Sequence, residues 1–382
     1  MQAAGVIPPV VTPAMHTYSL IRYCLVFVSF AYTLTALWFF LEDGRAARWR
    51  DSVQRFAPNR FMAFVYFYLF FAMILTAIRF PLSFYSGYIL DHQFGLSNQT
   101  MGTWFFDLVK AKVVEIAIAG PSLFLAFTIL EKFPRRWPLV LWACLTPLIA
   151  AGIFLTPLVI DPLYNKFTPM PDSALRTQIR DLTHKAGIPD APIFVVDKSR
   201  QTSKLNAYVT GIGSSARVVI WDTTLHKLPP EQVLAIVGHE TGHYVLGHIY
   251  WGFLLSSGGL LLALLLLGKY KDLLVARFPS RWQITSATDL AIIPVLMLGA
   301  TIVSFVGSPI DNSISRVMEH QADVYGLQIT GNGPAMARTF VSLSEQNLSE
   351  PDPPAFIQFW FFGHPSLKER IDYSLGLLRS NS

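Results

Sequence analysis

The sequence predicts a mainly α-helical fold: a polytopic bundle of about six transmembrane helices, joined to a small α/β domain that carries a short β-sheet. Three observations lead to this prediction. The chain of 382 residues is 52% hydrophobic and only 14% charged, which is too apolar for a soluble globular domain. Six apolar runs are long enough to cross a bilayer. Two polar segments between and after these runs contain short helix and strand patterns.

The apolar runs divide the chain into regions, because a transmembrane helix needs roughly 20 residues. The runs cover roughly residues 18–41, 61–80, 113–131, 138–160, 249–267 and 289–308. We therefore expect an N-terminal tail at 1–17, four transmembrane helices at 18–160 and two more at 249–308. The remaining segments, 161–248 and 309–382, form the two parts of one extramembrane domain.

The distribution of lysine and arginine predicts the orientation. Twelve of them lie in loops 42–60, 132–137 and 268–287, which share one side of a six-helix bundle, whereas loop 81–112 has only Lys110 and Lys112. The positive-inside rule places the Arg-rich side in the cytoplasm and the two polar segments on the opposite face. One miscounted crossing would move those segments to the cytoplasmic face. Because the basic residues act as topology signals, the net charge of +5 does not indicate a nucleic-acid partner.

A His239-Glu240-x-x-His243 motif lies shortly before the fifth apolar run. On a helix, the spacing of four residues puts both imidazoles on one face, where they can bind one metal ion. Glu240 is then placed to take a proton from a water molecule on that metal. The pattern is typical of a zinc hydrolase and predicts one Zn²⁺ per chain. The alternative is a pair of core histidines beside a surface glutamate.

The position of the motif predicts a metal at the membrane boundary. His243 precedes Ile249, where the apolar run starts, by six residues, or about 9 Å of helix. A metal at the membrane boundary would suit an enzyme that cleaves lipid-linked or membrane-embedded peptides. His248 falls off the ligand face of a continuous helix, and we expect it to be an interfacial residue.

The third metal ligand is predicted after the sixth run. Glu319 and Asp323 are four residues apart and share a helix face, so Glu319 can bind the metal while Asp323 holds the other ring nitrogen of a ligand histidine. A solvated helix face is the alternative. The fifth and sixth runs form a hairpin, so that His243 and Glu319 lie on the same side of the membrane. Zinc would keep its fourth position for water.

The polar segment 161–248 contains the patterns of a small sheet. Asp172 is the expected N-cap of a helix, and β-strand patterns cover 193–196, 204–210 and 217–221. The glycines of 211–215 are typical of a hairpin turn. Within the second pattern, Asn206-Ala207-Tyr208 is a candidate edge strand to which an extended peptide substrate could add, and an ordinary hairpin strand is equally consistent.

Two residues near the C-terminus are candidates for stabilising an oxyanion. His364 and Arg370 begin the last predicted helix, and an imidazole or guanidinium near zinc can stabilise the charge that develops when water attacks a peptide carbonyl. Their spacing alone leaves this role open.

Taken together, these motifs resemble the type I CAAX prenyl endopeptidase family, from about residue 60 to the C-terminus. The resemblance rests on five motifs in order: Pro162 through Pro169, Asn206-Ala207-Tyr208, His239-Glu240-x-x-His243, Glu319-x-x-x-Asp323, and His364-Pro365 through Arg370. It implies a membrane zinc protease with an intramembrane chamber. It also implies that Glu319 is a zinc ligand, that the strand at Asn206 aligns the substrate, and that His364 and Arg370 assist at the carbonyl.

The chain departs from the family pattern in several places. Eukaryotic members have seven membrane helices and a cytosolic catalytic face, whereas this sequence shows six runs, the missing helix falling between the first and the second. Lys204-Leu205 stands before Asn206 in place of small and histidine residues, and Ser366 replaces a second proline. These differences concern substrate recognition and leave the metal chemistry unchanged.

The predicted function is that of an integral-membrane zinc metalloendopeptidase. Its partners would be membrane lipid and a peptide or protein substrate that is lipid-modified or membrane-embedded. Two other classes stay open: a membrane-protein quality-control protease of the HtpX type without a lipid requirement, and a non-enzymatic scaffold with a structural metal. The sequence does not predict the oligomeric state.

Overall fold

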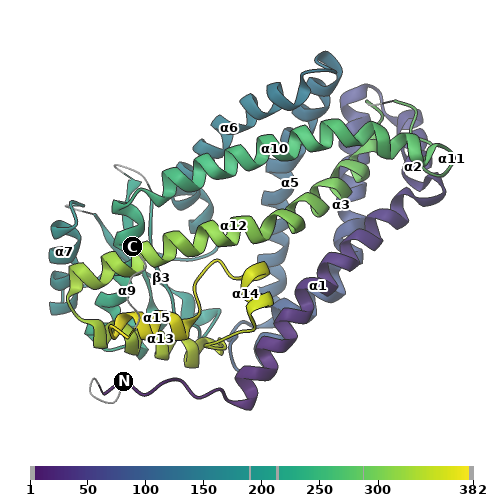
Figure 1. Ribbon diagram of the computed structural model, residues 1–382. Helices are drawn as coiled ribbons and strands as arrows, with labels where there is room; N and C mark the ends of the chain where they lie inside the picture. Colours follow the sequence, from purple (N-terminus) through teal and green to yellow (C-terminus); the bar gives the residue numbers. More distant parts are fainter. Residues whose placement is uncertain (1–4, 189–190, 212–214, 287, 378–382) are drawn as a thin grey trace.

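The computed structural model describes residues 5–188, 191–211, 215–286 and 288–377. Long helices run along the molecule, and a small domain caps one end of the bundle they form (Figure 1). The small domain contains α7, α9, α13 and α15 together with the sheet, whereas α2 and α11 lie at the other end (Figure 1). The predicted combination of a membrane bundle with a small α/β domain is therefore confirmed.

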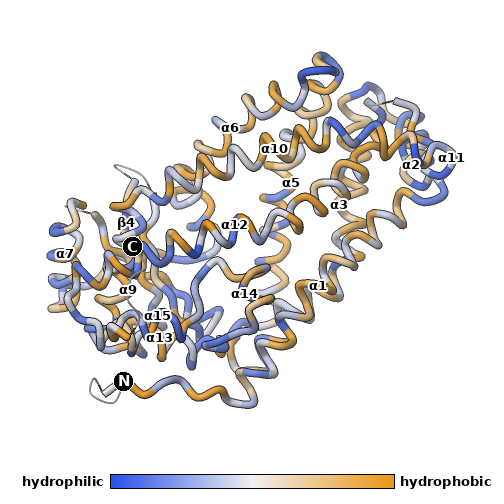
Figure 2. The backbone as a smooth tube through the Cα atoms, in the orientation of Figure 1, coloured by the Kyte–Doolittle hydropathy of each residue, from blue (hydrophilic) through white to orange (hydrophobic). Residues whose placement is uncertain are grey.

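Six helices of the described residues are long and apolar enough to cross a membrane, as the sequence predicts. Apolar residues dominate the middle of the bundle and polar residues gather at its two ends (Figure 2). The six candidate spans are Pro13–Phe56, Arg60–Gln93, Met101–Lys132, Trp137–Leu163, His248–Arg277 and Leu290–Thr330. Each span is longer than its apolar run because the helix continues into polar sequence.

The α-helices of the bundle and of the small domain alternate along the chain. In order they are α1 (Pro13–Leu41), α2 (Arg45–Phe56), α3 (Arg60–Phe84), α4 (Leu90–Gln93), α5 (Met101–Lys132), α6 (Trp137–Leu155), α7 (Ala174–Lys185), α8 (Asp222–Lys227), α9 (Pro230–Val245), α10 (His248–Arg277), α11 (Pro279–Trp282), α12 (Ile293–Thr330), α13 (Gly333–Asn347), α14 (Ala355–Phe361) and α15 (Leu367–Ser374).

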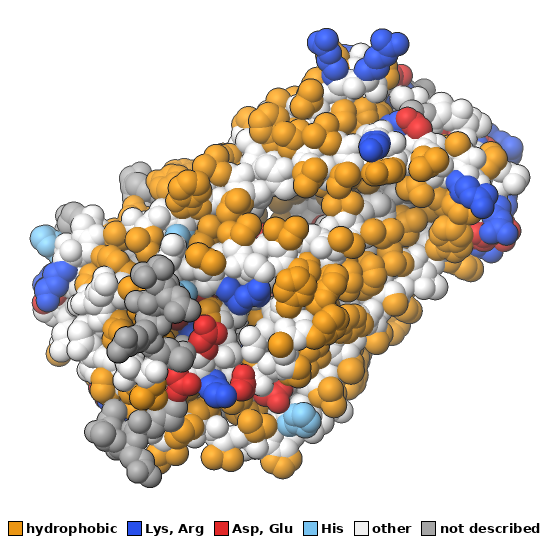
Figure 3. Space-filling model, viewed as in Figure 1, with side chains coloured by type: hydrophobic (Ala, Val, Ile, Leu, Met, Phe, Trp, Pro, Cys, Tyr) orange, Lys and Arg blue, Asp and Glu red, His pale blue; other side chains and the backbone are white. Residues whose placement is uncertain are grey.

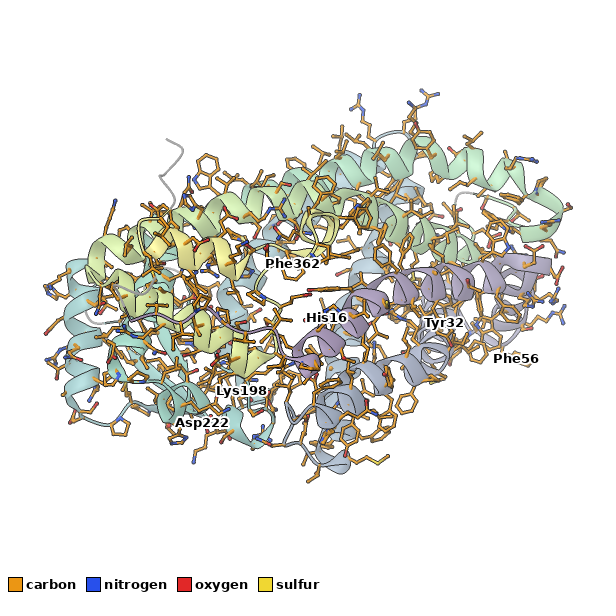
Figure 4. All side chains as sticks on the ribbon, turned by 60° about the horizontal axis from the view of Figure 1, so that its bottom comes forward. His16, Tyr32, Phe56, Lys198, Asp222 and Phe362 are labelled. Atoms are coloured by element: carbon orange, nitrogen blue, oxygen red, sulfur yellow. The ribbon has the colours of Figure 1, made fainter. Side chains whose placement is uncertain are left out.

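A buried ion pair lies at the end of the bundle opposite the small domain. Arg50 on α2 donates to Asp289, whose side chain is 1% exposed and also accepts from the backbone N–H groups of Thr285 and Ala291. The short α2 occupies the place between the first two membrane helices where the family's additional helix is expected. Lysine and arginine side chains crowd this end of the surface (Figure 3). Phe56 marks it in Figure 4, far from Lys198 and Asp222 of the small domain.

A cavity of about 480 Å³ lies inside the bundle, among α1, α3 and α5. Its lining is mixed, with apolar side chains beside Tyr32, Thr76 and the charged residues of α5. Glu115 forms an ion pair with Lys112 there.

The small domain contains a four-stranded sheet in the order β1-β2-β4-β3. Its strands are β1 (Phe167–Pro169), β2 (Ile193–Val196), β3 (Ala207–Thr210) and β4 (Arg217–Trp221). β2 and β4 pair in parallel, while the edge strands β1 and β3 are antiparallel to their neighbours.

The strand predictions match the structure closely, with two differences. β2 and β4 have the predicted bounds, whereas β3 begins at Ala207 and not at Lys204. β1 was not predicted, because its three residues include Pro169, which a strand tolerates only at an edge. The central residues of the predicted turn, 212–214, lie outside the described residues.

The predicted N-cap of α7 is wrong by one residue. Ser173 caps the helix, and its Oγ accepts from the backbone N–H of Arg176 at 3.1 Å. Asp172 instead forms an exposed ion pair with the Arg176 side chain. Ile179 and Leu182 of α7 pack in one core with Val218 and Ile220 of the sheet.

Candidate metal centre

Helices α9 and α12 meet at very short range, and this contact positions the predicted site. A Cβ atom built on Gly326 would lie 2.8 Å from the backbone nitrogen of His239, and one on Gly242 would lie 3.1 Å from Cα of Ala322. Only residues without a large side chain allow two helix backbones to come so close. The contact brings the histidine face of α9 opposite Glu319 on α12.

The three predicted ligands lie together at this contact. One nitrogen from each of His239 and His243 and one carboxylate oxygen of Glu319 all lie within 4.8 Å of one another. His239 Nε2 is 3.3 Å from Glu319 Oε2, and His243 Nε2 is 3.4 Å from Glu319 Oε1. Two nitrogens and one oxygen that converge in this way are the ligand set of a catalytic zinc site with an open fourth position.

The chemistry of these atoms fits a cation. The two Nε2 atoms face each other at 3.1 Å, and Glu319 Oε2 is buried without a hydrogen-bond partner among the described residues. Burial alone would lower the pKa of His239, but the adjacent Asp323 carboxylate raises it to about 9. The cluster therefore attracts positive charge, and a divalent cation can replace the proton.

Asp323 and Arg370 lie at Nδ1 of His239. Asp323 Oδ1 is 2.8 Å from His239 Nδ1, which leaves Nε2 of that ring to face the centre. The Arg370 guanidinium donates two bonds to the same carboxylate, with Nε 2.8 Å from Oδ2 and Nη2 2.6 Å from Oδ1. It is 7% exposed and stacks over the Phe340 ring at 4.2 Å. Arg370 Nη2 also lies 3.3 Å from Nδ1 of His239, so that the guanidinium contacts both members of the Asp323–His239 pair.

Glu240 lies beside a small pocket. Burial raises the pKa of its carboxyl group, which favours uptake of a proton. The pocket has a volume of about 110 Å³ and is lined by both polar and apolar side chains. Its lining residues are Asn206, Ala235, Ile236, His239, Glu240, Met336, Thr339, Phe340, Leu343, His364 and Arg370.

His364 lies at the rim of the centre, in the loop between α14 and α15. Its Nε2 is 3.3 Å from Glu319 Oε1, and its side chain is 61% exposed. The imidazole therefore reaches the cluster from the solvent side, whereas His239 and Glu319 are each 10% exposed. This position is suited to a group that contacts a bound substrate.

The candidate substrate strand is an edge strand, with only part of it at the pocket. Asn206 lines the pocket together with Glu240. Ala207 is buried in the core, and burial raises the pKa of Tyr208 to about 12. The Thr224 hydroxyl accepts from the Asn206 N–H at 2.9 Å and donates to its carbonyl at 2.8 Å, which fixes the start of β3.

His248 differs from the sequence prediction. It is 7% exposed, and its Nδ1 lies 2.9 Å from Nδ1 of His243. The prediction assumed one continuous helix, but Gly247 has φ +68° and interrupts it between α9 and α10. Glycine is the residue that adopts this conformation most easily, so Gly247 was the available signal.

The geometry and the fold define a class: a multi-pass membrane protein whose metallopeptidase centre lies between the helix that enters the fifth span and the helix that leaves the sixth. Comparisons with known proteins give the family. The model of peptidase family M48 matches residues 169–374, and the model of the CAAX prenyl protease N-terminal region, five membrane helices, matches residues 2–166. The chain belongs to peptidase family M48.

Individual relatives agree with this assignment. The chain is 33% identical to the uncharacterized metalloprotease YhfN of Bacillus subtilis, over 94% of this chain and 84% of that protein. It is 29% identical to CAAX prenyl protease 1 of Saccharomyces cerevisiae, over 78% and 68% of the two chains. The crystal structure of S. mikatae Ste24p matches with a TM-score of 0.82 and 26% identity, over 96% of this chain and 91% of that chain.

The resemblance to the CAAX prenyl protease family is thereby confirmed, and the protein is an integral-membrane metalloprotease that hydrolyses peptide bonds. One detail differs from the N-terminal family model, which is described as five membrane helices. Among the described residues up to 166, four helices are long and apolar enough to span.

Proposed function

We propose that the protein is a zinc-dependent endopeptidase that cleaves membrane-associated peptides and proteins, in the manner of the CAAX prenyl proteases. Residues 161–248 and 309–382 form its catalytic domain. The observation that carries the proposal is the convergence of His239, His243 and Glu319 within 4.8 Å, on one helix that directly precedes a membrane span and one that forms part of another.

Each residue of the centre has a proposed role. His239, His243 and Glu319 hold one zinc ion, which supplies Lewis acidity toward water and the peptide carbonyl. Glu240 takes a proton from the attacking water and delivers it to the leaving amine, a task that its raised pKa favours. His364 donates a hydrogen bond to the oxyanion from the open side of the centre.

The surrounding residues position these groups. Asp323 orients His239, and Arg370 neutralises the buried carboxylates behind it. We propose that the substrate adds to the free edge of β3 at Asn206, Ala207 and Tyr208, so that its scissile carbonyl lies near Glu240.

The substrate class follows from the position of the centre. Several relatives are named CAAX prenyl proteases, and in this chain the ligand-bearing helices α9 and α12 adjoin or form membrane spans. A substrate held in the membrane by a lipid would present its peptide at this boundary. Prenylated peptides are accordingly the substrates that we propose.

The orientation follows from the charges. Six spans put both catalytic segments on one face, and the Arg-rich loops lie at the other end of the molecule (Figure 3). The positive-inside rule then places the catalytic face opposite the cytoplasm. Protease protection of residues 161–248 in sealed vesicles tests this, since digestion from the cytoplasmic side would reverse the assignment.

A cleavage assay with two matched peptides tests the function. The purified protein is expected to contain one zinc per chain and to cleave a prenylated peptide faster than the same peptide without the lipid. Glu240→Gln should keep the zinc and lose at least 10²-fold in rate, on the order of a general-base contribution. Equal cleavage of both peptides would instead indicate a quality-control protease. Zinc without any cleavage would indicate a structural metal.

A further inference from the structure

His248 occupies a buried position that no role described so far explains. It is the first residue of α10 and is 7% exposed, although it is polar and lies at the start of a membrane span. Its two ring nitrogens both have partners: Nδ1 lies 2.9 Å from His243 Nδ1, and Nε2 lies 3.1 Å from Gln321 Oε1. The three side chains come from α9, α10 and α12.

The backbone at Gly247 makes this arrangement possible. On a continuous α-helix, a residue five positions after His243 would point about 140° away from it. The left-handed conformation of Gly247, with φ +68°, ends α9 and starts α10 in a new direction. The His248 ring thereby turns back toward the His243 ring, and the ring centroids lie 4.9 Å apart in an edge-to-face arrangement.

The positions of the protons follow from the ligand role of His243. Its Nε2 faces Glu319 and His239, so the lone pair must be on Nε2 and the proton on Nδ1. The Nδ1–H group then donates to Nδ1 of His248, which must be an acceptor. His248 consequently carries its own proton on Nε2 and donates it to Gln321 Oε1. Every ring nitrogen of the two histidines has one defined use.

We propose that His248, held by Gln321, is the positioning residue of His243. It fixes the tautomer and the ring orientation in which His243 offers Nε2 to the metal, as Asp323 does for His239. The two ligand histidines thus have different partners, a carboxylate for His239 and a neutral imidazole for His243. A neutral acceptor orients the ligand without adding a further negative charge to the centre. The proposal rests on the proposed zinc site.

Zinc affinity of the purified full-length protein tests the proposal, measured by competition with a chromophoric chelator. His248→Phe keeps the ring volume and removes the acceptor, and we expect its zinc affinity to fall 10- to 100-fold, the usual effect of losing such a partner. His248→Asn places a carbonyl oxygen near the position of Nδ1 and should keep the affinity within about threefold of wild type. This rescue separates an acceptor role from simple packing.

Gln321 supplies a second, independent pair of variants, which is useful if His248→Phe fails to fold. Its side chain is exposed, so its replacement leaves no cavity. Gln321→Leu removes the acceptor for His248 and should weaken zinc binding severalfold, whereas Gln321→Glu keeps an acceptor and should not. The absorption bands of the Co²⁺-substituted protein should shift in His248→Phe and Gln321→Leu only, because the His243 ring is then free to rotate.

The outcomes distinguish this proposal from the proposed function. Wild-type protein that binds no zinc would refute the zinc site itself. If wild type binds zinc and His248→Phe binds it equally well with an unchanged Co²⁺ spectrum, the positioning role is refuted while the zinc site stands. Equal losses in His248→Phe and His248→Asn would also refute it, because they would show that packing alone matters.

Discussion

Replacing Gly326 by alanine should disturb the metal centre without touching any ligand. Gly326 lies on α12 where that helix crosses α9, and the added Cβ would lie 2.8 Å from the backbone nitrogen of His239 and 3.0 Å from its Cα. The obstacle is helix backbone, which cannot rotate away as a side chain can. The two helices must therefore separate.

The structure gives the size of this displacement. Bringing the Cβ from 2.8 Å to an ordinary contact of 3.4 Å moves the helices apart by about 0.6 Å at this point. Metal–ligand distances in working sites lie within about 0.2 Å of their ideal values. Because His239 is carried by α9 and Glu319 by α12, the displacement exceeds what the coordination sphere accepts. Overpacking of this kind also costs about 1–3 kcal/mol of stability.

The assay compares zinc affinity and peptidase rate of Gly326→Ala with a matched control. Gly258→Ala is the same change in the middle of α10, where a Cβ would meet nothing within 4 Å. We expect Gly326→Ala to lose at least tenfold in zinc affinity, in line with other losses of support around a metal. Gly258→Ala should bind zinc as wild type does. If Gly326→Ala retains wild-type affinity and rate, the idea that this helix contact sets the ligand geometry is wrong.

Three further predictions, the last with a control substitution, have defined outcomes. Asp323→Asn leaves the buried Arg370 charge without its partner, so the free energy of unfolding, measured by thermal unfolding, should fall by about 3–5 kcal/mol. Zinc affinity, measured by chelator competition, should fall 10- to 100-fold. Unchanged affinity would contradict the orienting role of Asp323. Thr224→Val leaves the N–H of Asn206, in the proposed substrate strand, unpaired. This substitution should raise KM more than it lowers kcat, with normal zinc content. A change in kcat alone would contradict this prediction. Asp289→Asn removes the buried partner of Arg50 and should lower stability by about 3–5 kcal/mol without changing zinc affinity. Asp51→Asn alters the half-exposed partner of Arg50 and should lower stability by less than about 1 kcal/mol. Equal losses of stability would contradict the importance of the buried pair.

The sequence predicts most of the fold because its signals are local. Apolar runs of about 20 residues mark the membrane helices whatever their neighbours are. The runs of β-branched residues at 193–196 and 217–221 likewise have the bounds of β2 and β4. β1 lacks such a signal, since its three residues form a strand only because β2 offers a partner.

The distinction between local signals and those that depend on a neighbouring element also applies to the site. The spacing of His239 and His243, or of Glu319 and Asp323, is defined within one helix, and the helix period is enough to place each pair on a common face. The partners of Arg370 depend on how α15 packs against α12, which no local pattern encodes. His248 was misplaced for a related reason: one left-handed residue, Gly247, invalidates the helix period for everything that follows it.

The proposed substrate strand and the proposed metal ligands are anchored separately to the membrane helices. Lys204, just before β3, donates to Asp91 at 3.1 Å and to the Tyr18 hydroxyl at 3.1 Å, which ties the strand to α4 and α1. The metal ligands are tied to α10 and α12 through the α9 contact. For a peptide bound to β3 as proposed, the distance to the metal would therefore depend on how the bundle holds these two groups of helices. The membrane helices would then contribute to the catalytic geometry in addition to anchoring the domain.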